Sequence, residues 1–448
     1  MRIAIIGGGY VGLVSAACFA EFGTDVTVVE AEPNKLAALQ QGRIPIYEPG
    51  LDNLVSKNVA TGRLSFTADL SSAVNGAEAV FIAVGTPTRR GDGHADLSYV
   101  YAAAEQVARA LTGYSVIVTK STVPVGTCRQ VQEIVRSTRP DLDFDVASNP
   151  EFLREGSAIA DFMRPDRVVI GAESTRSQEV LRRLYRPLYI IEAPILFTGV
   201  ETAELIKYAA NAFLAMKVTF INEVADLCEK IGADVHDVSH GIGLDGRIGR
   251  KFLHPGPGYG GSCFPKDTLA LMRTAQDYGA PLRLVETTVS INDARKSAMA
   301  VRVLSACGGS VRGKTLGVLG LTFKPETDDI REAPSIPIIT RLVGEGATVR
   351  VFDPHGMQPA SLVLPEGVVY CRDALDAATG ADAVVLITEW NEFRALSPER
   401  LKELMHGNII CDFRNAWDPA LIEQAGLAYH GVGRAKPKAV RQRGSARA

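Results

Sequence analysis

The sequence contains no run of about 18 consecutive apolar residues, the length needed to cross a bilayer. Its formal net charge is only -3 over 448 residues, so no excess of basic residues points to nucleic acid as a partner. The 7 cysteines are scattered and include no C-x-x-C pair, which indicates neither a zinc site nor a disulfide framework. These absences favour a cytoplasmic protein with no metal, no nucleic acid and no membrane among its ligands.

What the chain does have is the composition of a folded protein, with 46% hydrophobic and 22% charged residues. A chain of this length typically folds as about three domains. Basic residues concentrate only in the segment 434–448. We expect this segment to be a disordered, solvated tail rather than an arm that binds nucleic acid or membrane.

The first 30 residues predict a dinucleotide-binding βαβ unit. A short apolar strand, residues 2–6, leads directly into the G-x-G-x-x-G of residues 7–12. Gly7 permits the tight turn, Gly9 lets the backbone approach a pyrophosphate, and Gly12 permits close packing of the following helix. The next strand ends in Glu30, the acid expected about 20 residues on to bind a ribose diol. An acid here favours NAD over NADP, whose 2′-phosphate it would repel.

Three further strands are predicted at 79–84, 115–119 and 144–147, and a polar loop follows each of them. Loops at the carboxyl ends of parallel strands build the ligand crevice of a doubly wound sheet. The threonines of the first two loops therefore face a cofactor or serve only the turns. The third loop, 148–156, carries two carboxylates and an amide, which suits either acid/base chemistry or the start of a capped helix.

Residues 202–231 are almost free of glycine and proline, and their apolar positions recur at helical spacing. We predict a long buried helix whose apolar positions include Leu205, Ala209, Phe213, Met216, Phe220, Val224 and Leu227. Lys207 and Asn211 lie four residues apart and so share one face. From its position alone, Lys207 is expected to lay its stem along the surface rather than bury its amine. His236 and His240 have metal-ligand spacing but no third ligand, which favours ordinary surface histidines.

The decapeptide 259–268, Y-G-G-S-C-F-P-K-D-T, places a thiol next to glycines and two charged side chains. A cysteine reacts as the thiolate, so a nucleophilic Cys263 needs positive charge or hydrogen-bond donors and a group that handles protons. Lys266 and Asp267 are neighbours that can supply either. The decapeptide alone fits a small buried thiol in a tight turn better than a nucleophile.

The last third of the chain repeats the first in outline. Residues 346–354 match the pattern of 23–30, and residues 380–388 match that of 76–84. This repetition predicts a second α/β domain without the G-x-G-x-x-G, which should bind a nucleotide differently or not at all. Basic residues near its predicted strand ends suit phosphate recognition or are simply solvated.

Six motifs in one order resemble the UDP-glucose 6-dehydrogenase family, especially its bacterial members, over residues 1 to about 430. They read G-x-G-Y-V-G, S-T-V-P-V-G-T, N-P-E-F-L-R-E-G, E-L-I-K-Y-x-x-N-A-F-L-A, G-Y-G-G-S-C-F-P-K-D and F-K-P-E-T-D-D-I-R-E. The resemblance implies an α/β fold of two Rossmann-like doubly wound domains, joined by a long central helix that also forms a homodimer interface. The implied regions are 1–198 for NAD, 199–305 for dimerisation and catalysis, 306–433 for the UDP-sugar, and the tail 434–448.

The resemblance also implies a reaction, in which the C6 alcohol of UDP-glucose is oxidised to a carboxylate with two NAD+, supplying a precursor for polysaccharide. Cys263 matches the nucleophile that forms a thiohemiacetal and then a thioester. Lys207 and Asn211 match oxyanion donors, and Asp267 and Glu151 match the carboxylates that move protons. Thr122 matches a residue near the hydrolytic water.

Two further sets of residues carry over by position. The positions implied for NAD are Gly7, Gly9, Tyr10, Val11, Gly12, Glu30, Lys35, Thr86, Thr122, Glu155 and Arg331. Those implied for the nucleotide sugar are Phe152, Leu153, Arg154, Glu155, Lys207, Asn211, Arg247, Phe252, Tyr259, Gly260, Phe323, Lys324 and Arg414. One departure is Glu30, which stands where the family more often has Asp; the longer side chain still accepts two ribose hydroxyls.

Two rival functions are compatible with the motifs. One is a sister enzyme acting on GDP-mannose or a UDP-N-acetylhexosamine, but residues 244–249 and the Phe264-Pro265 pair are more similar to the UDP-glucose branch. The other is a catalytically silent nucleotide-sugar sensor, which the presence of Cys263, Lys207 and Asp267 disfavours.

Overall fold

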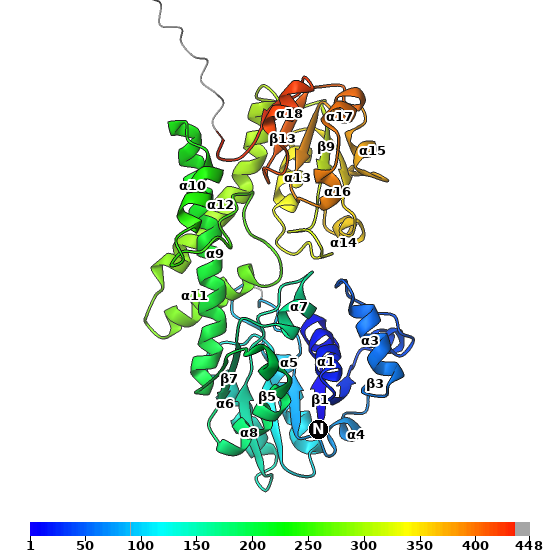
Figure 1. Cartoon of the computed structure of the whole chain (residues 1–448), viewed down its shortest axis with the longest axis vertical. Coiled ribbons are helices and arrows are strands. Elements are labelled where there is room, and N and C mark those ends of the chain that lie inside the picture. The colour runs from blue at the N-terminus through cyan, green and yellow to red at the C-terminus, as the bar shows by residue number, and fades with distance from the viewer. Residues whose placement is uncertain (90, 435–448) are drawn as a thin grey trace, which may run out of the picture. The chain divides into compact units, whose positions relative to one another are not determined.

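The computed structural model describes residues 1–89 and 91–434. They form two compact units, the first from residues 1–211 and 266–281, the second from residues 212–265 and the chain from 282 onward. Each unit is built on a mainly parallel sheet with helices on both faces (Figure 1). The predicted α/β fold with two Rossmann-like sheets is confirmed.

The first unit contains an eight-stranded sheet in the order β3-β2-β1-β4-β5-β6-β7-β8. All neighbouring strands run parallel except β6 and β7. The predicted strands are confirmed to within a residue or two at their ends. The strands are β1 (Arg2–Ile6), β2 (Asp25–Val29), β3 (Leu64–Thr67), β4 (Ala79–Ile82), β5 (Ser115–Thr119), β6 (Phe144–Ser148), β7 (Val168–Ala172) and β8 (Ile195–Thr198).

Helices cover both faces of this sheet because successive strand residues point to opposite sides. Ile3 and Ile5 pack with α1, α3, α7 and α8, whereas Ala4 and Ile6 pack with α4, α5 and α6. The helices are α1 (Tyr10–Glu21), α2 (Pro33–Gln40), α3 (Leu51–Ala60), α4 (Leu70–Val74), α5 (Ser98–Ala110), α6 (Thr127–Thr138), α7 (Ala158–Met163), α8 (Thr175–Leu184), the 3-10 helix η1 (Arg186–Ile191) and α11 (Phe264–Asp277).

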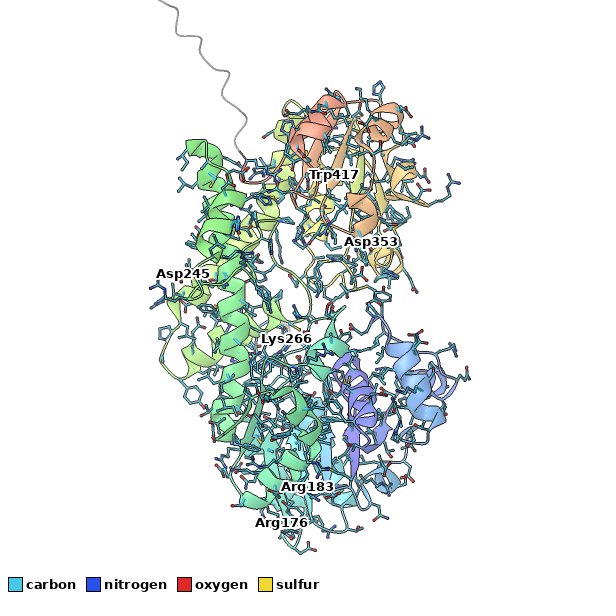
Figure 2. The ribbon with its side chains drawn as sticks, viewed as in Figure 1. Arg176, Arg183, Asp245, Lys266, Asp353 and Trp417 are labelled. Carbon is cyan, nitrogen blue, oxygen red and sulfur yellow. The ribbon has the colours of Figure 1, made fainter. Side chains whose placement is uncertain are left out.

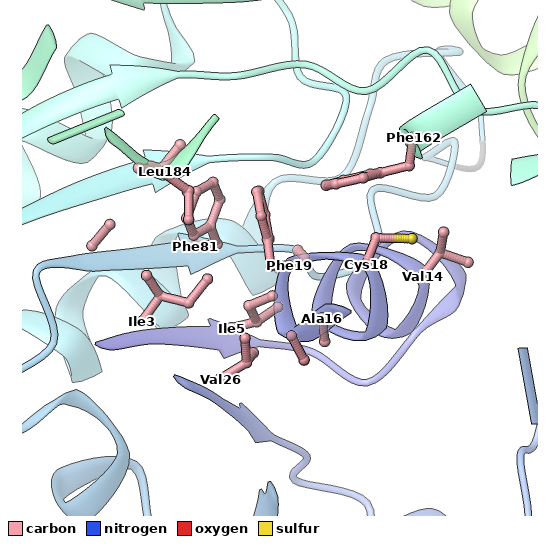
Figure 3. Close-up of a cluster of buried hydrophobic side chains, with 14 of the residues drawn as sticks. Ile3, Ile5, Val14, Ala16, Cys18, Phe19, Val26, Phe81, Phe162 and Leu184 are labelled. Atoms are coloured by element: carbon pink, nitrogen blue, oxygen red, sulfur yellow. The ribbon is translucent and has the colours of Figure 1, made fainter. Parts of the chain in front are cut away.

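Phe19 lies at the centre of the α1 side of this core (Figure 3). Its ring meets Phe162 edge-on, with centroids 4.9 Å apart, and also contacts Phe81 and Tyr185. Such edge-to-face pairs add roughly 0.5–1.5 kcal/mol beyond the apolar area they bury. This cluster ties α1, which follows the glycine turn, to the segments that follow β6 and β7.

The second unit contains a six-stranded parallel sheet in the order β11-β10-β9-β12-β13-β14. This is the same order, relative to the first strand, as the first six strands of the other sheet. The strands are β9 (Thr315–Leu319), β10 (Thr348–Phe352), β11 (Val369–Tyr370), β12 (Ala383–Leu386), β13 (Ile409–Asp412) and β14 (Ala428–His430).

One face of the second sheet packs with α9, α12 and α13, and the other with α15, α16, α17 and α18. The repeat found in the sequence is therefore a repeat of strand order and layering. The remaining helices are α9 (Val200–Ile231), α10 (Val235–Gly243), α12 (Arg283–Ala306), α13 (Ser335–Gly344), α14 (Met357–Ser361), α15 (Ala374–Ala378), α16 (Asn391–Arg394), α17 (Pro398–Leu404) and α18 (Pro419–Gln424).

The long central helix is confirmed as α9, which contributes residues to both units. The prediction that the apolar stripe of this helix is buried was wrong within a single chain. Phe213, Phe220 and Leu227 are 59%, 51% and 56% exposed. Another face of the helix is buried instead, through residues that include Tyr208 and Ala215. Both faces have helical spacing, so periodicity could not tell which of them packs.

Three smaller expectations concern the ends and the histidines. Segment 434–448 lies outside the described residues except for Arg434, whose Nε is 3.8 Å from a carboxylate oxygen of Asp234. His240 is exposed as predicted, whereas His236 is partly buried, which lowers its pKa. Within residues 1–89 and 91–434, no helix is long and apolar enough to cross a membrane.

Candidate active site

The glycine turn between β1 and α1 has the shape that a dinucleotide requires. A side chain at Gly7, where φ is 106°, would bring its Cβ within 2.7 Å of the Ala83 carbonyl oxygen, and one at Gly12 within 1.9 Å of the Gly7 oxygen. A Cβ at Gly9 would meet nothing within 4 Å. Gly9 is also the N-cap of α1 and offers no side-chain cap, so the first N–H groups of the helix can bind a phosphate.

Glu30 lies at the end of β2, where a ribose-binding acid belongs. Its carboxylate accepts hydrogen bonds from the N–H of Gly8 at 3.1 Å and of Glu32 at 2.9 Å, and Lys35 Nζ lies 3.1 Å away. Burial opposes ionisation, but these donors hold the pKa of Glu30 below its ordinary value. An ionised acid beside the glycine turn fits an NAD ribose.

Tyr10 and Val11 follow the turn as the first residues of α1 and are both partly buried. The Tyr10 hydroxyl donates to Glu48, and burial together with this carboxylate raises the pKa of Tyr10. Glu48 also accepts hydrogen bonds from the N–H groups of Gly156 and Ala158, at 2.6 and 2.7 Å. Glu48 therefore links the glycine turn to the loop after β6, a role that the sequence analysis missed.

The two threonine loops are joined by a hydrogen bond. Thr86, after β4, donates from its hydroxyl to the carbonyl oxygen of Thr122, after β5, over 3.0 Å. Thr86 is buried and Thr122 is half-buried. The bond fixes these neighbouring strand ends relative to one another.

Lys207 and Glu151 form a buried ion pair that joins α9 to the loop after β6. Lys207 Nζ donates to Glu151 Oε1 over 2.9 Å, and the two side chains are 4% and 5% exposed. The expectation that Lys207 lies along the surface was therefore wrong, because this face of α9 is buried within the first unit. Burial works to raise the pKa of Glu151, but the Lys207 ammonium and the Leu153 N–H lower it below its ordinary value.

A second buried pair lies one helical turn further along α9. Asn211 Nδ2 donates to Asp267 Oδ2 over 2.6 Å, and Lys266 Nζ donates to Asp267 Oδ1 over 2.7 Å. Asp267 is only 1% exposed. The spacing of Lys207 and Asn211 on one helix thus sets two carboxylates, from separate parts of the chain, along one face of α9.

The other residues of the first unit that are predicted to bind the sugar differ in their burial and in their partners. The Phe152 ring lies 5.4 Å from Lys207 Nζ and 3.7 Å from the Arg167 guanidinium carbon. Leu153 and Glu155 are half-buried. Arg154 is exposed and forms an ion pair with Asp161, so its guanidinium is already engaged at the surface.

In the second unit, the loop that leads to Cys263, here called the thiol loop (residues 259–263), packs on the loop after β9. A Cβ at Gly260 would lie 2.4 Å from the Glu332 carbonyl oxygen, and one at Gly261, where φ is 84°, would lie 2.8 Å from the Phe323 ring. The Gly261 N–H donates to the Arg331 carbonyl oxygen over 2.8 Å. Both glycines therefore serve the packing between these two loops, and the contact predicted between Gly260 and the sugar stays a prediction.

Cys263 is half-buried and directly precedes the first residue of α11. The first N–H groups of a helix favour an anion such as a thiolate at this position. Ser262 Oγ lies 3.6 Å from Cys263 Sγ, and the Ser262 N–H donates to Asp329 Oδ2 over 3.1 Å. All 7 cysteines are described and none forms a disulfide.

The side chain of Asn292, in α12, binds the backbone of Tyr259 at the start of the thiol loop. The sequence patterns did not point to this residue. Its side chain accepts from the Tyr259 N–H over 2.8 Å and donates to the Tyr259 carbonyl over 3.1 Å. Asn292 is 3% exposed, a property that only the structure reveals, so no sequence pattern singled it out. Phe252 has a φ of 64°, a strained value for a bulky residue, and its ring lies 5.9 Å from that of Phe264.

The predicted basic residues of the second unit differ in their surroundings. Arg414 is held by the carbonyl oxygens of Ile387 and Phe323, at 2.7 and 2.9 Å. Lys324 Nζ lies 5.6 Å from the Phe323 ring. The exposed side chains of Arg331 and Arg247 pair with Asp329 and Asp245, respectively. Groups of three metal-binding side chains are not found among the residues the structure describes.

A doubly wound sheet with this glycine turn and this acid is the fold of an NAD-dependent dehydrogenase. Models of one family match most of the chain: its NAD binding domain matches residues 1–189, its central domain 201–294 and its UDP binding domain 317–419. The chain therefore belongs to the UDP-glucose/GDP-mannose dehydrogenase family, and NAD is its cofactor.

Relatives match the chain over almost its whole length. A UDP-glucose 6-dehydrogenase of Rhizobium meliloti is 59% identical over 97% of this chain and 100% of its own length. Another from Bacillus subtilis is 48% identical over 97% and 93%. Among solved structures, a UDP-glucose dehydrogenase of Pyrobaculum islandicum has a TM-score of 0.89 and 40% identity over 97% of this chain and 98% of its own.

Proposed function

We propose that the protein oxidises the C6 alcohol of UDP-glucose to a carboxylate, consuming two NAD+ and releasing UDP-glucuronate as a precursor for polysaccharide. The observation that carries this proposal is a half-buried thiol at the start of α11, in a chain that also holds the buried Lys207–Glu151 and Asn211–Asp267 pairs. Relatives that bear the name UDP-glucose 6-dehydrogenase, at 59% and 48% identity, support the choice of sugar.

The proposed chemistry holds the intermediate on Cys263. NAD+, when bound, accepts the hydride that C6 loses in each oxidation. The first oxidation converts the alcohol to an aldehyde and releases the hydroxyl proton. The Cys263 thiolate then bonds to the aldehyde carbon, and loss of a second hydride turns the thiohemiacetal into a thioester. Water breaks the C–S bond, so the carboxylate leaves and the thiol is regenerated.

Charged and polar side chains of α9 suit the oxyanions of this sequence. The Lys207 ammonium and the Asn211 amide are donors that stabilise a developing C6 oxyanion, most strongly where water is excluded. Asp267, whose carboxylate accepts from Asn211 and Lys266, is proposed to accept protons. Glu151 is ionised at neutral pH because its pKa is lowered, and is therefore able to take a proton from the hydrolytic water near Thr122.

We assign the binding residues by the same reasoning. The glycine turn with Tyr10, Val11, Glu30, Lys35, Thr86, Thr122, Glu155 and Arg331 is proposed for NAD. The nucleotide sugar is proposed to contact Phe152, Leu153, Arg154, Glu155, Arg247, Phe252, Tyr259, Gly260, Phe323, Lys324 and Arg414. These assignments follow the regions 1–198 for NAD, 199–305 for catalysis and 306–433 for the UDP-sugar.

We further propose a homodimer formed through α9. Phe213, Phe220 and Leu227 lie seven residues apart, so they line one side of the helix, and each is more than half exposed. Such a stripe is costly to leave in water and is typical of a helix that meets another helix. Light scattering should give twice the monomer mass for the wild type, and Phe220→Glu should give the monomer mass; a monomeric wild type would refute this assignment.

A panel of nucleotide sugars tests the function directly. Purified protein should form two NADH per UDP-glucose and should leave GDP-mannose and UDP-N-acetylhexosamines almost unused. A related solved structure, with a TM-score of 0.84 and 26% identity, is a UDP-D-ManNAc dehydrogenase of Pyrococcus horikoshii, which makes this control necessary. If the protein prefers another nucleotide sugar, the proposed substrate is wrong. If no sugar yields NADH, the assignment as an enzyme is refuted.

A further inference from the structure

Lys120 is a second buried lysine of the first unit, and the proposed reaction gives it no role. It follows β5 directly and is 4% exposed. Its Nζ donates to Asn149 Oδ1 over 3.1 Å and to the Tyr185 hydroxyl oxygen over 3.4 Å. Both partners are neutral. Asn149 is the second residue before Glu151, so Lys120 holds the same loop that carries the proposed base.

The fold by itself gives no reason for a charge at this position. Within the described part of the chain, no carboxylate oxygen lies within 4.0 Å of the Lys120 ammonium, although the Phe162 ring lies 5.8 Å away. Tyr185 already donates to Asn149 Oδ1 over 2.6 Å, and Asn149 in turn donates to the Val169 carbonyl over 2.8 Å. Tyr185 and Val169 therefore also hold Asn149, so anchoring the loop does not by itself require a charged amine, and a buried ammonium with neutral partners costs folding free energy.

The charges around Lys120 indicate what the amine does. Burial lowers the pKa of Lys120 to about 8, Glu151 opposes this shift and Lys207 adds to it. Conversely, Lys120 helps to lower the pKa of Glu151. Two buried cations thus act on one buried carboxylate, and only Lys207 is paired with it directly. Lys120 and Lys207 together carry two positive charges against the single negative charge of Glu151.

The extra positive charge matters because Lys207 is proposed to stabilise the C6 oxyanion as well as to pair with Glu151. An oxyanion on C6 competes with Glu151 for the Lys207 ammonium, and a buried carboxylate that loses its only cation takes up a proton. A protonated Glu151 can no longer accept a proton from water. Lys120 is a second buried cation whose charge favours the ionised form of Glu151.

We propose that Lys120 is a positioning residue for Glu151, which anchors the loop after β6 through Asn149 and keeps the carboxylate charged while Lys207 stabilises the oxyanion. This inference rests on the proposed function. The groups that face Lys120 are Asn149 and Glu151 after β6, Tyr185 after α8, Phe162 of α7 and, through its charge, Lys207 of α9.

The test compares Lys120→Met, which removes the charge, with Lys120→Arg, which keeps it, by measuring kcat for UDP-glucose from pH 5 to 10. We expect Lys120→Met to lower kcat roughly 10- to 100-fold, with KM values changed less than about 3-fold. The acidic limb of the kcat–pH profile of Lys120→Met should move to higher pH, because Glu151 becomes harder to ionise. Lys120→Arg should return the limb to its wild-type position.

One control and one substitute variant make the outcomes distinct. Tyr185→Phe removes a bond to Asn149 but leaves the charge, so its acidic limb should stay where the wild type has it. If Lys120→Met does not fold, Lys120→Gln replaces it in the same comparison. The proposal would be overturned if the acidic limb of the kcat–pH profile did not move in Lys120→Met. It would also be overturned if kcat fell as much in Lys120→Arg as in Lys120→Met. Failure of the function itself would appear earlier, as a wild type that forms no NADH from UDP-glucose.

Discussion

The two sheets share one strand order, yet they use the acid at the end of their second strand in opposite ways. In the first unit, Glu30 follows β2 and accepts from Gly8, beside the open backbone at Gly9. In the second unit, Asp353 follows β10 and is 0% exposed. Its carboxylate accepts from the N–H groups of Leu321, Thr322, His355 and Gly356, the Thr322 hydroxyl and the Trp390 indole.

The difference shows that one strand order is compatible with an acid that is available to a ribose and with one that is not. Six donors from the protein saturate Asp353, labelled in Figure 2, so none of its oxygen lone pairs is left for a ribose. Asp353 therefore stabilises the turns around it instead of offering a ligand site. A nucleotide in the second unit must therefore be held by other groups, for which basic side chains such as Lys324 and Arg414 are the candidates.

The largest expected effect separates chemistry from binding. Cys263→Ser should lower formation of UDP-glucuronate by roughly three orders of magnitude, because a serine hydroxyl is a far weaker nucleophile than a thiolate. Calorimetry should show that UDP and NAD still bind with wild-type affinity. Wild-type turnover would remove Cys263 from the mechanism.

The next prediction addresses the glycine turn that only the first sheet has. Gly12→Ala should weaken NAD binding about 10-fold or more, because the new Cβ would lie 1.9 Å from the Gly7 carbonyl oxygen and displace the turn. UDP affinity should not change. Gly113→Ala is the matched control, since a Cβ there meets nothing within 4 Å; equal losses in both variants would mean that the turn does not bind the cofactor.

Exchanging the two acids for amides tests the comparison itself. Asp353→Asn should lower the free energy of unfolding by about 2–4 kcal/mol, because its amide N–H₂ would face backbone donors. Glu30→Gln should cost less stability than Asp353→Asn, because Glu30 accepts from two backbone N–H groups rather than from six donors, and it should reduce NAD affinity about 10-fold. Urea unfolding and calorimetry measure both quantities for both variants. The opposite pattern would reverse the roles that we assign to the acids.

The smallest expected effect is a pH dependence of the first unit. Burial raises the pKa of Glu204 to about 7, although the N–H groups of Gly126 and Cys128 donate to it at 2.7 and 2.8 Å. The folded state then holds this proton at pH values where the unfolded state has released it. Stability should fall as pH rises from about 4.5 to about 7, by roughly 2 kcal/mol from this group.

Glu204→Gln removes this titration, so its unfolding free energy should change less between pH 4.5 and pH 8 than that of the wild type. Glu179→Gln is a suitable control, because Glu179 is an exposed residue of α8. Identical pH dependence in Glu204→Gln and the wild type would mean that Glu204 is ionised at its ordinary pH in the fold.

Local patterns in the sequence were enough for much of the fold and part of the site. Glycines at 7, 9 and 12 between a strand and a helix fix the turn, and the acid at 30 follows from the spacing of the unit. The strands and the helix over 202–231 follow from short periodicities. Likewise, Cys263 stands out only because six motifs together carry a family resemblance.

Only the tertiary structure decided which faces are buried and which side chains meet. Lys207 and Glu151 are 56 residues apart in the chain, as are Asn211 and Asp267, and no local pattern encodes either pair. The same holds for the exposed stripe of α9, for the amine of Lys120 and for the saturation of Asp353. Periodicity and turn chemistry act over a few residues, whereas burial, and with it the charge state of a side chain, depends on packing between distant segments.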